Sequence, residues 1–106
     1  MMAEKRDTLQ ALVKSWHREI EAAVTYRALA ERETDSRRRD ILQKLVTAEQ
    51  EHAAKWAARI RELGGAVPDP STVKSALGLT LQLASPEVIY RKLEAIDRGE
   101  PALAGE

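Results

Sequence analysis

The sequence of 106 residues contains no cysteine, which excludes disulfide bonds and ligation of zinc by thiolates. It has no apolar run near the roughly 20 residues that span a bilayer, and no hydrophobic signal core at its N-terminus. An excess of charge is missing too, because 17 basic and 17 acidic residues give a net charge of zero, which favours neither nucleic acid nor an anionic membrane as a partner. We therefore expect a soluble, cytoplasmic domain that binds no nucleic acid and is membrane-associated only as part of a longer chain.

Two long segments have apolar residues at intervals of three and four, the spacing of one face of an α-helix. The first predicted helix begins after Asp7 or Thr8, either of which can cap it, and runs to about Glu33. The second begins near Asp35 or Ser36 and stops at Gly64-Gly65, since glycine favours helix termination. The residues between the two helices favour turns, so we predict that the chain folds back there as an antiparallel hairpin.

The rest of the chain is predicted to form two shorter helices after a linker with two prolines, residues 66–70. The first of these helices covers residues 73–84, although its GLTLQL core also alternates as a strand does. A capping serine followed by a proline, Ser85 and Pro86, starts the other helix, which runs to about Asp97. The predicted architecture is one all-α domain, 1–106, with the hairpin at 8–64 and the accessory helices at 71–98.

Three ionisable residues occupy the apolar stripes of the two long helices, where charged groups are rarely left without a partner. Glu19 lies on the stripe of the first helix between Trp16 and Tyr26, while Glu49 and His52 fill a gap in the stripe of the second. Being three apart, Glu49 and His52 point the same way. In an antiparallel hairpin, residues equally distant from the turn lie at the same height, and Glu19 and this pair are equidistant from it. Two carboxylates and an imidazole are therefore predicted to meet across the hairpin.

Such a group is costly to bury on its own, whereas a bound cation removes most of the cost. Mixed carboxylate and imidazole ligands suit Fe(II), Mn or Zn. The alternative is that these residues are ordinary parts of the helices. Glu19 then covers the core with its stem, Glu49 and His52 form a local pair, and Tyr26 serves packing alone, as both tryptophans are expected to do. The coincidence of three polar groups at one height favours the metal site.

A resemblance to the ferritin-like superfamily, and to rubrerythrin-type domains in particular, covers most of the chain. It rests on EIEAAVTYRALAERETDSRRRDILQKLVTAEQEHAAKW, residues 19–56, and on ALGLTLQL, residues 76–83. The sequence resembles most the ferritin-like domain that precedes vacuolar-iron-transporter-type membrane domains, and encapsulated ferritins share its ligand set of one Glu and one Glu-x-x-His. The resemblance implies a di-iron ferroxidase that oxidises Fe(II) with dioxygen or peroxide, for iron storage or detoxification. It also implies a membrane iron-transporter domain or an encapsulating shell as a partner.

One departure from the family pattern is that this chain carries half of a di-iron ligand set. We expect a homodimer or a higher homo-oligomer, in which dimerisation completes a ferritin-like four-helix bundle and each dimer interface holds two Fe ions, or Mn or Zn. In that arrangement Glu49 bridges the metals and Glu19 bridges or caps them. His52 is a terminal ligand, and Tyr26 donates a hydrogen bond to a ligand carboxylate. The alternative completion is internal, with a carboxylate from the fourth helix: Glu87, Glu94 or Asp97.

Two other functions stay open at this level. The same apolar stripes would serve a non-catalytic module that dimerises or docks a partner helix, with Glu19 and His52 paired across the seam. A rubrerythrin-like domain that reduces peroxide would use the same ligand residues.

Overall fold

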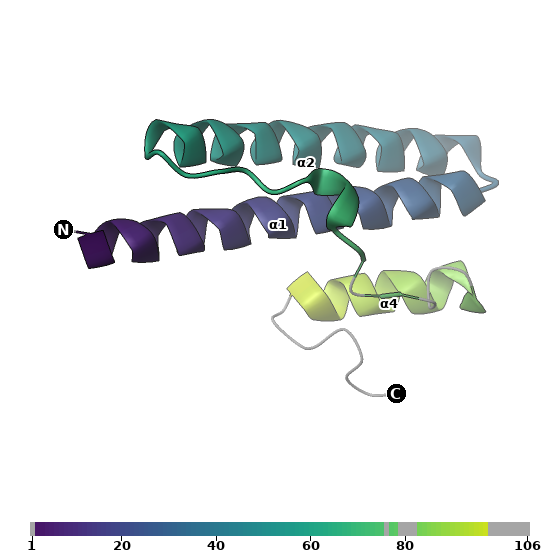
Figure 1. Ribbon diagram of the computed structural model, residues 1–106. Helices are drawn as coiled ribbons and strands as arrows, with labels where there is room; N and C mark the ends of the chain where they lie inside the picture. The colour runs from purple at the N-terminus through teal and green to yellow at the C-terminus, as the bar shows by residue number, and fades with distance from the viewer. Residues whose placement is uncertain (1, 76, 79–82, 98–106) are drawn as a thin grey trace.

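The computed structural model describes residues 2–75, 77–78 and 83–97. All regular secondary structure within these residues is helical. Two long helices, α1 (Met2–Arg32) and α2 (Ser36–Glu62), lie side by side in opposite directions, which confirms the predicted hairpin (Figure 1). A short 3-10 turn, η1 (Pro70–Thr72), follows in the segment that leaves α2, and the helix α4 (Pro86–Asp97) begins where Ser85 and Pro86 predict.

Both ends of α2 have the caps that the sequence predicts. Asp35 has an extended backbone, φ −79° and ψ 120°, and its carboxylate accepts a 2.9 Å hydrogen bond from the backbone N–H three residues on. At the other end, Gly64 adopts φ +82°. The N–H groups of Gly64 and Gly65 donate to the carbonyl oxygens of Arg61 and Ile60, each at 2.9 Å. A left-handed glycine with this pair of bonds satisfies the last carbonyls of a helix.

The start of α1 differs from the prediction. The helix begins at Met2, so Asp7 and Thr8 lie inside it and do not cap it. The Thr8 hydroxyl donates a 2.9 Å hydrogen bond to the carbonyl oxygen of Glu4, one turn earlier, as hydroxyls inside helices commonly do. Residues 3–6 are Ala, Glu, Lys and Arg, all good helix formers, which accounts for the longer helix.

The helix predicted for residues 73–84 is wrong over its first part. Residues 73–75 are not helical, and Leu77 and Gly78 form a turn in which the Gly78 N–H donates to the Ser75 carbonyl at 3.1 Å. Two features stabilise this non-helical segment. The Ser75 and Thr25 hydroxyls form a 2.7 Å hydrogen bond, and the side chains of Val73 and Leu77 are buried. Of the remaining residues of that prediction, Leu83 is helical and Ala84 is not, whereas 76 and 79–82 lie outside the described residues.

The core is divided into two hydrophobic clusters. The turn cluster lies near the connection between α1 and α2 and consists of Leu29, Ala30, Leu42, Leu77 and Ile89. The distal cluster lies farther along the hairpin and consists of Trp16, Ala53, Ala57, Ile60 and Val73. Complete burial of an isoleucine side chain contributes about 1.5–3 kcal/mol, so the fully buried Ile89 is a main attachment of α4 to the hairpin. In the part of the chain that the structure describes, no helix is both long enough and apolar enough to cross a bilayer.

Candidate metal centre

The three predicted ligand residues lie together on the hairpin. Glu19 projects from the middle of α1, and Glu49 and His52 project from α2, so that one ligand atom of each lies within 4.8 Å of the other two. The Nδ1 atom of His52 is 3.7 Å from Oε2 of Glu19. At that distance the two side chains attract each other when the imidazole is protonated, without a direct hydrogen bond. Among the described residues, this is the one group of three acidic or histidine side chains with such a spacing.

The charges of this group favour a bound cation. Two carboxylates held within reach of one another repel, and a cation between them replaces that repulsion with attraction. Glu19 and Glu49 are half-buried, which strengthens the effect relative to fully hydrated groups, whereas 52% of the His52 side chain is exposed. Two oxygen donors and one nitrogen donor suit Fe(II), Mn or Zn, and the exposed side of the group leaves room for ligands from outside the chain.

The group opens onto an exposed apolar face of α2. Ile41 is 52% exposed and Leu45 is 36% exposed, and both precede the ligand pair on the same helix. Steps of four residues lead from Ile41 to Leu45 and from Leu45 to Glu49, and His52 follows three residues later, so all four lie on one face. The two aliphatic side chains thus form a small exposed apolar patch on the face that carries Glu49 and His52. A molecule that covers Ile41 and Leu45 will also approach the ligand residues.

The other residues predicted for the site lie outside the group formed by Glu19, Glu49 and His52. Tyr26 lies two helical turns beyond Glu19 and is partly buried against the turn cluster; its hydrogen bond to a ligand carboxylate stays a prediction. Glu87 and Glu94 are exposed on α4, and neither belongs to the group of three. The side chain of Asp97 lies outside the described residues. The described side chains therefore supply no internal carboxylate that completes the ligand set.

A second polar cluster lies at the turn; an ion pair of Glu33 with a nearby arginine is one of the two settings that the sequence suggests for it, the other being solvent. Glu33 is 8% exposed, and its carboxylate accepts hydrogen bonds from the Asp35 N–H at 3.3 Å, the Arg38 guanidinium at 3.1 Å and the Tyr90 hydroxyl at 3.1 Å. Burial by itself raises the pKa of Glu33, but the hydrogen bonds from Asp35, Tyr90 and Arg38 lower this pKa by more, so that it lies below its ordinary value. Because Tyr90 is 57 residues from Glu33, no local pattern indicates the contact. The cluster joins α4 to the turn and is separate from the candidate metal centre.

Comparison of the chain with protein-family models, with curated proteins and with solved structures finds no match. Function is therefore inferred from the geometry of Glu19, Glu49 and His52, and the resemblance to ferritin-like domains stays an expectation from the sequence.

Proposed function

We propose that this protein is a di-iron carboxylate protein that oxidises Fe(II), with each metal site shared between two copies of the chain. The observation that carries the proposal is the convergence of Glu19, Glu49 and His52 within 4.8 Å, beside exposed aliphatic side chains. A cation bound between two half-buried carboxylates and an imidazole would replace the repulsion of the carboxylates with attraction. The resemblance to ferritin-like domains adds iron as the expected metal.

The exposed face of α2 supports the sharing of the site between two copies. Two chains together supply four carboxylates and two histidines, the ligand set of a di-iron helical bundle. A two-fold axis through this face covers Ile41 and Leu45 of both copies and brings the two ligand groups face to face. Complete burial of one such side chain contributes about 1.5–3 kcal/mol, so this contact favours association. Metal binding and association then stabilise each other.

Iron would supply the redox chemistry: two Fe(II) ions lose one electron each, and dioxygen takes up both electrons and two protons to give hydrogen peroxide. With hydrogen peroxide as the oxidant, two electrons and two protons give two molecules of water. The chain's own residues hold and neutralise the cations. Glu19 and Glu49 offset the positive charge, and His52 adds a nitrogen donor on the exposed side.

Aerobic addition of Fe(II) to the purified protein tests the proposal. We expect absorbance in the near ultraviolet to rise faster than in buffer, and this acceleration to be lost in the Glu49→Ala, His52→Ala variant. A matched control is the Glu51→Ala, His17→Ala variant, which removes one glutamate and one half-exposed histidine outside the group. Equal rates of iron oxidation in the two double variants would show that the proposed ferroxidase site is wrong. Metal analysis of the purified protein identifies which of Fe, Mn and Zn it carries.

The exposed Ile41 and Leu45 also favour a second candidate function, a non-catalytic module that dimerises or docks a partner helix. Light scattering with and without a chelator separates the two candidates. A shared metal site predicts that chelation, or the Glu19→Ala substitution, lowers the mass in solution. A plain helical module predicts a mass that does not respond to the chelator and iron oxidation no faster than in buffer.

A further inference from the structure

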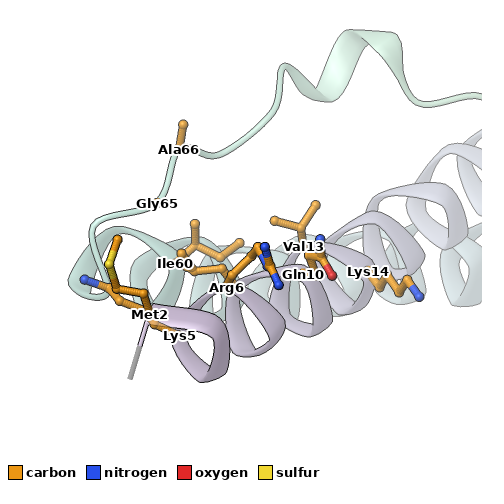
Figure 2. Close-up of a pocket in the computed structure, with 10 residues that line it drawn as sticks. Met2, Lys5, Arg6, Gln10, Val13, Lys14, Ile60, Gly65 and Ala66 are labelled. Atoms are coloured by element: carbon orange, nitrogen blue, oxygen red, sulfur yellow. The ribbon is translucent and has the colours of Figure 1, made fainter.

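A groove lies between the N-terminal part of α1 and the segment that leaves α2 (Figure 2). Its volume is about 830 Å³, within the range of about 300–1,000 Å³ for small-molecule sites. Leu9 and Val13 of α1 and Ala66 of the departing segment form an apolar floor, and the fully buried Ile60 lies beneath it. None of the three residues of the candidate metal centre lines this groove.

The charged residues of this part of α1 are separated by sign. Lys5, Arg6 and Lys14 line the groove, whereas Glu4 and Asp7 of the same stretch do not. All three basic side chains are exposed, so their charged ends stand in water at the rim of the apolar floor. The described residues that line the groove include no acidic side chain. The basic rim therefore attracts the anionic group of a ligand, while the floor favours contact with an apolar part of the same ligand.

The length of the groove indicates the shape of its ligand. Lining residues of α1 extend from Met2 to Lys14, and the apolar ones, Met2, Leu9 and Val13, span roughly 16 Å of helix axis. This span is comparable with an extended alkyl chain of about a dozen carbons.

We propose that this groove binds a linear aliphatic carboxylate, a fatty acid of medium or long chain. The alkyl chain lies along Met2, Leu9 and Val13, beside Ala66, and the carboxylate pairs with basic side chains of the rim. Arg6 and Lys14 are roughly 12 Å apart along the helix axis, so the rim offers a basic group near either half of the groove. A nucleotide or a sugar acid would place polar groups against the apolar floor, and an uncharged hydrocarbon would leave the rim unused. The proposal does not depend on metal binding at Glu19, Glu49 and His52, so either one can fail without the other.

Calorimetric titration of the full chain with laurate, below its micelle concentration, tests the proposal. We expect saturable binding of one laurate per chain. Dodecylamine has a similar alkyl chain and a positive head, and acetate has the carboxylate without the chain, so both are expected to bind at least tenfold more weakly. Dodecylamine binding as tight as that of laurate would overturn the proposal.

Charge reversal at the rim gives the matched comparison. The Lys5→Glu, Arg6→Glu, Lys14→Glu variant is expected to bind laurate about tenfold more weakly than the unaltered chain. A control variant with the same change in net charge reverses three exposed basic residues that do not line the groove: Arg37, Lys55 and Arg91. The control is expected to keep its laurate affinity within about twofold. Equal weakening in both variants would overturn the proposal.

A change of the floor tests the apolar part of the site. Ala66 is exposed outside the helices, so the Ala66→Asp substitution is expected to leave the fold intact while placing a charge in the path of the alkyl chain. We expect it to weaken laurate binding at least fivefold, and Ala58→Asp, on exposed α2 surface away from the groove, to leave binding unchanged. Equal laurate affinity in these two variants would contradict the proposal.

Two further measurements exclude other occupants. Flotation with anionic lipid vesicles, without saturable binding of laurate, would identify the groove as a membrane contact and overturn the proposal. A lower solution mass in the triple charge-reversal variant would identify it as a contact between copies of the chain, with the same consequence. Saturable laurate binding at an unchanged mass supports the proposal.

Discussion

The Tyr90 hydroxyl on α4 donates a 3.1 Å hydrogen bond to a carboxylate oxygen of Glu33, at the turn between α1 and α2. The other oxygen of that carboxylate accepts hydrogen bonds from the Arg38 guanidinium and the Asp35 N–H. The remaining attachment of α4 in this region is largely apolar, through Ile89 in the turn cluster. The bond from Tyr90 therefore adds a directional contact that apolar packing alone does not supply.

The Tyr90→Phe substitution removes this hydrogen bond and keeps the ring. We expect amide hydrogen exchange in α4 to become about fivefold faster, because the typical net loss for one hydrogen bond is of that size. Exchange measured residue by residue includes its own control, since amides in the middle of α2 are expected to keep their rates. Unchanged exchange in α4 would show that Ile89 and its apolar neighbours hold the helix without help from Tyr90.

The lowered pKa of Glu33 predicts how stability depends on pH. Burial raises the pKa of this carboxyl, but the hydrogen bonds lower it by more, so the folded chain keeps the carboxylate ionised below the ordinary pKa of 4.5. The stability that Glu33 contributes is therefore present above pH 4.5 and is lost as the pH falls from there through the lowered pKa. The free energy of unfolding is measured with urea at pH 7, 5, 4 and 3. At pH 7 it is expected to be lower for Glu33→Gln than for the unaltered chain, and this difference is expected to narrow below pH 4.5. A difference that stays constant down to pH 3 would contradict this account.

Gly65 is closely packed at the end of α2. A Cβ at this position would lie 2.8 Å from Leu9 Cδ2 and 3.0 Å from Ile60 Cγ2, and Ile60 is fully buried. Gly65→Ala is therefore expected to lower the free energy of unfolding by about 1–3 kcal/mol, the usual cost of overpacking. Ala66→Ser, at the exposed next position, is expected to stay within about 0.5 kcal/mol. Thermal unfolding of the two variants checks the difference, and equal melting temperatures would contradict it.

Substitution of Ile41 and Leu45 tests the proposed contact between two copies of the chain. The Ile41→Glu, Leu45→Glu variant places two charges on the exposed face, where burial against a second copy would be costly. We expect a lower mass in light scattering, slower Fe(II) oxidation, and unchanged helical content by circular dichroism. Lys44→Glu, at the exposed residue next to Leu45, is the control and is expected to keep the mass. A double variant with the original mass would show that this face is not the interface.

Local sequence signals were sufficient to predict the hairpin and the meeting of the three polar residues. Asp35 starts α2 because its carboxylate reaches an N–H three residues away, and Gly64 ends it because it adopts a left-handed backbone. Glu19 meets Glu49 and His52 because two antiparallel helices joined by a short turn fix the heights of their side chains. Metal binding by these residues stays a prediction.

Contacts between distant segments could not be predicted from the sequence. The Ser75 hydroxyl bonds to that of Thr25, 50 residues away, in the segment where a helix was expected. Glu33 and Tyr90 are 57 residues apart. The periodicity of apolar residues reports one face of one helix and carries no information about such polar pairs.

The three polar residues lie between the two hydrophobic clusters. On α1, Glu19 lies between Trp16 of the distal cluster and Leu29 of the turn cluster, and the ligand pair of α2 has cluster residues on both sides too. Apolar packing on both sides of the three polar residues therefore supports the register that the short turn sets. Exchange of glutamate for histidine, or the reverse, at positions 19, 49 and 52 is accordingly expected to keep the hairpin. The hairpin would then be a small scaffold on which the metal preference of the proposed site could be redesigned.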